Sequence, residues 1–196
     1  MVVKDIKAIR EQITSSQFLV FDFDGVLVNS VEVKTDAFAS LYKPYGSKIV
    51  KMVIAHHQEH GGMSRFDKFE YYHRVFLDEV ISEKDKIALS KRFSDIVVEK
   101  VIAAPEINGA MDFLRQYCGN GKRCAVNSAT PQTEIRSIVY AKGMSDFFST
   151  VLGSPSTKKE NLNNILDIHC CEADKTLFFG DAMSDFNASQ VSGTRF

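Results

Sequence analysis

Four short apolar runs that alternate with helix-like stretches constrain the fold of this chain most strongly. The runs begin at Phe18, Cys124, Thr150 and Thr176, and each ends in small or polar residues. Such runs predict buried strands. Strands that alternate with helices predict an α/β fold with a doubly wound parallel sheet, covered by helices on both faces and binding ligands at the carboxyl ends of its strands.

The first crossover is far longer than one helix requires. Residues 31–104 contain no convincing strand, and apolar residues such as Phe66 and Phe69 recur there at helical spacing. We therefore predict two domains. A Rossmann-like core comprises residues 1–30 and 105–196, and a small helical cap domain is inserted at residues 31–104.

Composition narrows the class of partner. The chain has 196 residues, 44% of them apolar, and a formal net charge of −1 with acidic and basic residues interleaved. No basic stripe indicates nucleic acid, and no long uncharged apolar run indicates a membrane span. The sequence thus favours a small-molecule partner, and it does not reveal the oligomeric state.

The cysteines and the amino-terminal sequence favour a cytoplasmic protein. The four cysteines show no CxxC spacing, and adjacent Cys170 and Cys171 rarely pair with each other, so a disulfide framework is not expected. A short amphipathic helix is expected at residues 5–13, where charges interrupt any signal-peptide core. Residues 191–196 read as a turn into another strand, so either the sheet lacks its last strand or the sequence is trimmed.

Two pairs of acidic residues follow predicted strands. Asp22 and Asp24 end the first strand with their side chains on one side, while Asp181 follows the last apolar run and Asp185 lies four residues further on. The carboxyl ends of parallel strands share one edge, so the four acids can meet. Close carboxylates favour a bound cation such as Mg²⁺, and Gly25 permits a sharp turn beside an anion. The alternatives are a plain turn at residues 22–25 and a helix cap at Asp185.

Groups that suit phosphate lie between the acid pairs. Ser128 ends the second strand, where its hydroxyl and the following amides can donate to phosphate oxygens at a helix amino terminus. Lys158 or Lys159 offers a positive charge for the same oxygens. Taken singly, Ser128 is better interpreted as a helix cap and the lysines as a solvated loop. Lys158 is preferred because Lys159 and Glu160 read as the start of the next helix.

The order of acid pair, serine, lysine and acid pair, each after a strand, resembles the helical-cap subfamily I of the haloacid dehalogenase-like hydrolase superfamily. The resemblance covers nearly the whole chain, although the family usually continues beyond residue 196. It implies that Asp22 is the nucleophile and Asp24 the general acid/base. It further implies a Mg²⁺ site formed by Asp22, the backbone carbonyl of Asp24 and Asp181, with Asp185 as the supporting acid, and a phosphate clamp that includes Ser128, Lys158 and Gly25.

This resemblance implies a Mg²⁺-dependent phosphatase that acts on a small phosphorylated metabolite, such as a sugar phosphate or a phosphoglycolate-like monoester, through an aspartyl-phosphate. The acid at Asp24 argues against dehalogenation, because an oxygen leaving group must be protonated. The alternative enzyme is a phosphomutase of the β-phosphoglucomutase type. Two non-enzymatic alternatives are a phospho-receiver domain, which lacks a helical insert, and a degenerate binding protein.

The inserted helical segment is expected to supply specificity. In residues 60–68, two glycines allow a loop to approach a ligand, and Arg65 or Lys68 can bind a carboxylate, a hydroxyl or a second phosphate. The alternative is a helix start with Ser64 as its cap and both basic residues on a solvated face.

Overall fold

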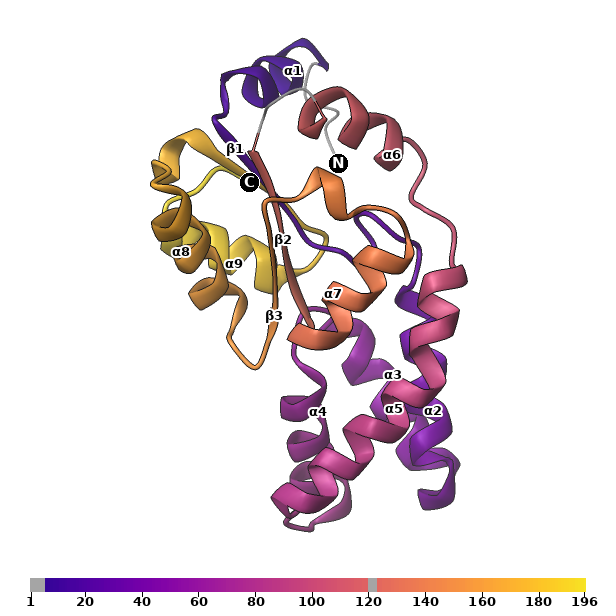
Figure 1. Ribbon diagram of the computed structural model, residues 1–196. Helices are drawn as coiled ribbons and strands as arrows, with labels where there is room; N and C mark the ends of the chain where they lie inside the picture. The colour runs from indigo at the N-terminus through magenta and orange to yellow at the C-terminus, as the bar shows by residue number, and fades with distance from the viewer. Residues whose placement is uncertain (1–5, 120–122) are drawn as a thin grey trace.

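The computed structural model describes residues 6–119 and 123–196 and is built around a four-stranded parallel sheet (Figure 1). Its strands, in the order β3-β2-β1-β4, are β1 (Phe18–Phe21), β2 (Arg123–Pro131), β3 (Thr150–Ser154) and β4 (Thr176–Phe179). Phe18 pairs with Arg123 on one side and with Thr176 on the other. The strands lie where the apolar runs predicted them, which confirms the α/β fold with a parallel sheet.

Helices cover both faces of the sheet. They are α1 (Ile6–Ser15), α6 (Ala110–Phe113), η3 (Leu114–Cys118), α7 (Gln132–Ala141), η4 (Ser145–Phe147), α8 (Lys158–His169), η5 (Ala173–Lys175) and α9 (Met183–Ser192). Side chains of β1 alternate between two apolar clusters, with Leu19 and Phe21 in one and Phe18 and Val20 in the other. Residues of α7 and η3 belong to the first cluster, and residues of α8 and α9 to the second. Figure 1 shows α7 on one side of the strands and α8 and α9 on the other.

A helical block, which we define as residues 31–104, follows β1. It contains α2 (Val31–Tyr42), η1 (Lys43–Tyr45), α3 (Ser47–Glu59), α4 (Arg65–Tyr71), η2 (Tyr72–Leu77) and α5 (Glu83–Ala103). Its interior is aromatic, because the ring of Phe38 lies 5.8, 5.9 and 4.5 Å from those of Phe69, Tyr72 and Phe93. Figure 1 places the block beyond the end of the sheet where α7 begins. The division into two domains stays a prediction.

The chain leaves the sheet for the helical block and returns along two adjacent segments. The amide of Asn29 donates to the carbonyl of Pro105 at 2.9 Å, and the amide of Ile107 donates to the carbonyl of Leu27 at 3.0 Å. An isolated antiparallel bridge joins Val28 to Glu106 between them. The two connections are therefore held together by backbone hydrogen bonds.

The ends of the described chain agree with the predicted elements. The first helix begins at Ile6, and residue 5, where it was expected to start, lies outside the described residues. At the other end α9 stops before Gly193, whose φ of +74° favours glycine. Arg195 then forms a parallel bridge with Leu177, so the predicted turn and the start of a further pairing beside β4 are both present.

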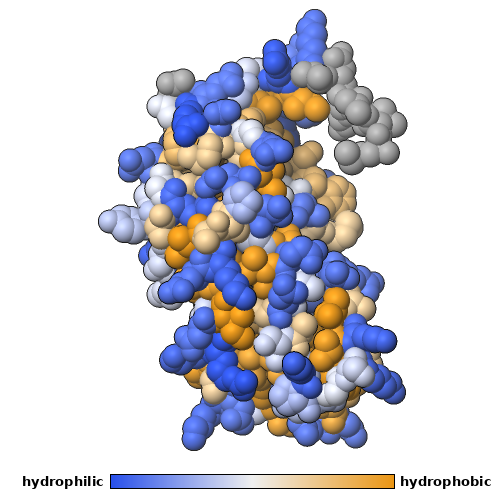
Figure 2. Space-filling model, turned by 90° about the vertical axis from the view of Figure 1, so that its right-hand side faces the viewer, coloured by the Kyte–Doolittle hydropathy of each residue, from blue (hydrophilic) through white to orange (hydrophobic). Residues whose placement is uncertain are grey.

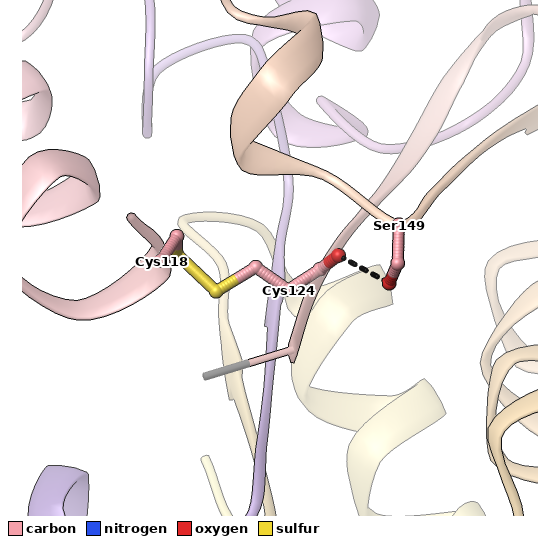
Figure 3. Close-up of a disulfide and its surroundings, with 3 residues drawn as sticks. All are labelled: Cys118, Cys124 and Ser149. Carbon is pink, nitrogen blue, oxygen red and sulfur yellow. Dashed lines mark hydrogen bonds between the residues drawn. A yellow bond between two sulfur atoms is a disulfide. The ribbon is translucent and has the colours of Figure 1, made fainter. Parts of the chain in front are cut away.

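The expectation that the cysteines form no disulfide is wrong for one pair. Cys118, at the end of η3, is bonded to Cys124 in β2, with Cα atoms 5.8 Å apart (Figure 3). The serine hydroxyl of Ser149 donates to the carbonyl of Cys124 at 3.0 Å. The sequence did not reveal this pair because its spacing matches no recognisable motif. The packing of η3 beside the sheet brings the two thiols together. Because Cys118 and Cys124 form a disulfide, they do not support a reducing compartment.

The surface and the helices say little about membranes. Within residues 6–119 and 123–196 no helix combines the length and the apolar character needed to cross a bilayer. Figure 2 shows one face of the elongated molecule, where hydrophilic side chains alternate with smaller apolar groups.

Candidate active site

Three carboxylates meet at the carboxyl edge of the sheet. Asp22 directly follows β1, Asp181 lies two residues after β4, and Asp185 stands in the first turn of α9. Each offers an oxygen within 4.8 Å of the other two. Three of the four acids predicted from two separate strands are therefore together in space.

Lys158 lies between two of these carboxylates. Its ammonium is 2.6 Å from Oδ2 of Asp22 and also contacts Oδ1 of Asp185. It opens α8, and the buried amide of Asn127 in β2 donates to its carbonyl at 2.8 Å. Lys159 is exposed. Of the two candidate lysines, Lys158 is thus the one in the site, and it is no part of a solvated loop.

Burial and neighbouring charges shift the pKa values of this cluster. Burial raises the pKa of Asp22 above its usual range, and the carboxylates of Asp185 and Asp24 add to this effect against the opposing charge of Lys158. Partial burial and the neighbouring Asp185 also raise the pKa of Asp181. Burial disfavours the Lys158 ammonium, but Asp22 and Asp185 outweigh it and raise its pKa.

The three carboxylates fit a hard divalent cation. All of the donors are oxygens, which Mg²⁺ prefers, and a cation would lower the raised pKa values of Asp22 and Asp181. Gly25 provides the space: a Cβ at this position would lie 2.0 Å from Oδ2 of Asp181, and its φ of +79° also favours glycine. Gly25 therefore turns the chain and leaves room for the Asp181 carboxylate.

Asp24 has different partners from Asp22. Its carboxylate accepts a hydrogen bond from Ser30 at 2.6 Å, contacts the ammonium of Lys34, and lies 3.4 Å from the hydroxyl of Thr130. Burial alone would raise its pKa, but Lys34 and the hydrogen bonds outweigh burial, and the pKa of Asp24 falls. Its side chain is thus outside the cluster of three carboxylates.

The alternative assignments of Asp185 and Ser128 have different outcomes. Asp185 is both a helix-end residue and a member of the site, because its Oδ2 accepts from the amide of Ala182 at 3.1 Å while Oδ1 faces Lys158. Ser128 is buried, and its hydroxyl accepts from the amide of Thr130 at 3.1 Å. It does not cap a helix, because β2 continues to Pro131 before α7 begins.

The site opens into a cavity of about 290 Å³ between the sheet and the helical block. Asp22, Asp24, Lys158 and Asp181 line it from the sheet, while α2, α3, α4 and α5 contribute from the block. Arg65 and Lys68 both line this cavity. The alternative that placed them on a solvated face is wrong, since the two residues are 5% and 1% exposed. Its other part holds, because Ser64 caps α4 by accepting from the amide of Asp67.

Arg65 and Lys68 have unlike partners. The guanidinium of Arg65 forms an ion pair with Glu134 in the first turn of α7, and it donates to Ser94 of α5 at 2.8 Å. Arg65 therefore links the helical block to α7, one of the helices that pack on the sheet. The ammonium of Lys68 instead lies 2.7 Å from Nδ1 of His57, a neutral partner.

Several site residues were not found from the sequence. Ser30 directly precedes α2, and Lys34 lies four residues later, so the two are neighbours on one side of the helix start. Because this helix start follows Asp24 closely in the sequence, both residues could have been predicted to lie near Asp24. Thr130, His57 and Glu134 carry no such signal, because only the tertiary fold brings them to the cavity.

Comparison with known proteins agrees with this arrangement. The features that we compared are a parallel sheet in an α/β fold, acidic residues after two strands and a helical insertion after the first strand. Residues 19–196 match the family described as haloacid dehalogenase-like hydrolase, and the chain belongs to this family.

Individual relatives are distant. The chain is 23% identical to a phosphoglycolate phosphatase of Rhodospirillum rubrum, over 89% of this chain and 76% of the relative. It is 25% identical to one from Aliivibrio fischeri, over 90% and 81% respectively. A β-phosphoglucomutase structure from Clostridium difficile shares the fold, with a TM-score of 0.76 and 17% identity over 91% of this chain and 82% of that chain.

Proposed function

We propose that this protein is a Mg²⁺-dependent phosphatase that hydrolyses a small phosphorylated metabolite through an aspartyl-phosphate on Asp22. The observation that carries the proposal is the pairing of Asp22 with Lys158 and two further carboxylates at the mouth of one cavity that also holds Asp24. The phosphoglycolate phosphatases among its relatives support this reaction class. A volume of about 290 Å³ suits a small metabolite, such as a short-chain or sugar phosphate.

Charge neutralisation is the first requirement of this chemistry. A phosphomonoester dianion repels a carboxylate nucleophile, so positive groups must lie beside it. Lys158 supplies one. Asp22 and Asp181, together with the backbone carbonyl of Asp24, would hold Mg²⁺, with Asp185 supporting the set. When bound, Mg²⁺ supplies charge stabilisation for the phosphoryl oxygens. We assign Ser128 and the turn at Gly25 to the same phosphate pocket.

Asp22 then acts as the nucleophile. Its carboxylate oxygen attacks phosphorus, the bond from phosphorus to the ester oxygen breaks, and that oxygen leaves as an alcohol after taking a proton from Asp24. A water molecule next attacks the phosphorus of the aspartyl-phosphate, and Asp24 takes its proton. Inorganic phosphate leaves and the Asp22 carboxylate is restored.

The environment of Asp24 suits the second half of this cycle. Burial raises the pKa of Asp24, but the charge of Lys34 and the hydrogen bonds from Lys34 and Ser30 together outweigh it and lower the pKa. The lowered pKa favours the carboxylate form, which activates water. The first half requires a protonated Asp24. The negative charge of the arriving phosphate raises the pKa of a nearby carboxyl, so substrate binding itself promotes this protonation.

The test is phosphate release from a panel of phosphorylated metabolites, measured with Mg²⁺ or with EDTA. Wild type is compared with Asp22→Asn and with Asp146→Asn, which changes an exposed carboxylate on η4. We expect Mg²⁺-dependent release that is lost only in Asp22→Asn. If no substrate releases phosphate while the folded protein interconverts sugar phosphates, the phosphatase proposal fails and a phosphomutase replaces it.

A further inference from the structure

Most charges that line the cavity occur in pairs. Asp22 is paired with Lys158, Asp24 with Lys34, and Arg65 with Glu134. Each pair compensates its own charge locally, so these groups have little net demand for a further ion apart from the cation site described above.

Lys68 breaks this pattern. Its side chain is 1% exposed, yet no carboxylate within residues 6–119 and 123–196 lies at ion-pair distance from its ammonium. The contacts of Nζ are Nδ1 of His57 at 2.7 Å and the face of the Phe38 ring, 5.5 Å from its centroid. A buried cation without an anion is costly, and proteins seldom retain one without a compensating group.

His57 positions this ammonium without neutralising it. Burial and nearby positive charges lower the pKa of His57 to about 3, so the ring stays neutral and accepts a hydrogen bond from Lys68. Since an ammonium has three N–H groups, His57 leaves others available to a ligand. Burial also lowers the pKa of Lys68 to about 7, with a further contribution from Lys34. Lys68 lines the cavity together with Lys34 and Asp24, and we refer to the part that these residues line as the Asp24 end.

The Asp24 end is where the proposed mechanism puts the leaving group. We propose that Lys68, held by His57, is the subsite for a second anionic group on the substrate, a carboxylate or a second phosphate carried by the leaving group. This inference rests on the proposed phosphatase function and deepens it, because it selects anionic leaving groups over neutral ones. Arg65 has no such role, as Glu134 already compensates it.

Three ligands of matched length test the subsite. They are 2-hydroxyethyl phosphate, with a neutral end, 2-phosphoglycolate, with a carboxylate, and ethylene glycol bisphosphate, with a second phosphate. Wild type should favour at least one anionic compound over the neutral one by roughly 10- to 100-fold in kcat/KM, as expected for one charge-assisted hydrogen bond. Which of the two is favoured distinguishes the carboxylate from the phosphate.

The variants separate recognition from packing. Lys68→Met should reduce this preference to near unity, chiefly through KM, and Lys68→Gln provides the same test should the methionine variant not fold. Lys51→Met changes an exposed lysine of α3 and should keep the wild-type preference. A purely structural Lys68 would lower stability and leave the preference intact, and that result would overturn the proposal.

A binding measurement separates this inference from the proposed function. Calorimetry with Asp22→Asn, in which no phosphoryl transfer is expected, should show the same anion preference, and Asp22→Asn/Lys68→Met should lack it. If wild type releases no phosphate from any compound, the phosphatase proposal fails, and the calorimetry still decides the subsite. Equal affinity of Asp22→Asn for the neutral and both anionic compounds would refute the subsite.

Discussion

The two walls of the cavity handle charge in opposite ways. At the sheet edge, Asp22, Lys158 and Asp185 are packed so that each charge has an opposite neighbour. In the helical block, Lys68 is equally buried, and its partners among the described residues are the neutral His57 and the ring of Phe38. The first arrangement suits chemistry common to every phosphomonoester, because it acts on the phosphoryl group. The second suits recognition, because its charge is compensated only when a suitable ligand arrives.

The largest effect is expected from replacing Lys158, the lysine that contacts both Asp22 and Asp185 at the sheet edge. Lys158→Met leaves two buried carboxylates facing each other, so we expect a loss of about 3–5 kcal/mol in the free energy of unfolding and a fall of roughly 10³-fold in phosphate release. Urea unfolding and the phosphate assay measure the two effects. Lys159→Met, which changes the exposed neighbour, is the control. A Lys158→Met protein as stable as wild type would show that the edge needs no internal compensation.

Gly25 tests whether space for Asp181 matters more than backbone conformation. Gly25→Ala adds a Cβ 2.0 Å from Oδ2 of Asp181, whereas Gly109→Ala has a similar φ of +85° with nothing within 4 Å. Both variants should lose about 1–3 kcal/mol of stability through backbone strain. Only Gly25→Ala should lose about 100-fold in activity through displacement of the carboxylate. Equal activities in the two variants would contradict the crowding argument.

The contact between the two walls is tested by a double-mutant cycle on Arg65 and Glu134. Both side chains are buried, so the coupling in unfolding free energy between Arg65→Met and Glu134→Gln should reach about 1–3 kcal/mol. The exposed pair of Lys91 and Asp95 on α5 should give a much smaller coupling. Coupling energies of similar size would mean that the bridge contributes no more than a surface pair.

A further expected effect is a pH dependence of stability due to Lys68. Its folded-state pKa of about 7 lies below its ordinary value of 10.5, so between these values the unfolded chain binds the proton and the folded protein does not. The stability of wild type relative to Lys68→Met should therefore rise as pH increases from about 7 to 10. Urea unfolding of both proteins across this range measures the difference. A relative stability that falls over the same interval would place the pKa of Lys68 above its ordinary value.

Sequence patterns predicted the sheet and its acidic edge because both depend on local order. An apolar run followed by an acid fixes where a carboxylate leaves a strand, and parallel strands end at one edge, so Asp22 and Asp181 were found without tertiary information. The preference for Lys158 over Lys159 came from a similar local pattern, and Lys158 is the lysine that lies beside the carboxylates. The position of Ser128 was less predictable, since β2 runs further than the pattern suggested.

Groups that meet only through tertiary packing were not predictable. Arg65 and Glu134 are 69 residues apart, and nothing local marks either as the partner of the other. The bond between Cys118 and Cys124 joins residues only six apart, but it was missed because their spacing matches no motif. Lys68 was singled out from the sequence, but its lack of a carboxylate partner depends on how three helices of the block surround it.

The adjacent exit and return segments of the helical block carry an evolutionary consequence. The amide of Asn29 and the carbonyl of Pro105 are 2.9 Å apart, so the ends of the block's insertion point almost touch. A linker of a few residues spans that gap, because each extended residue covers about 3.3–3.6 Å. An insert of different length can therefore be joined at the same two segments, and such an exchange would replace one wall of the cavity together with Lys34, the partner of Asp24.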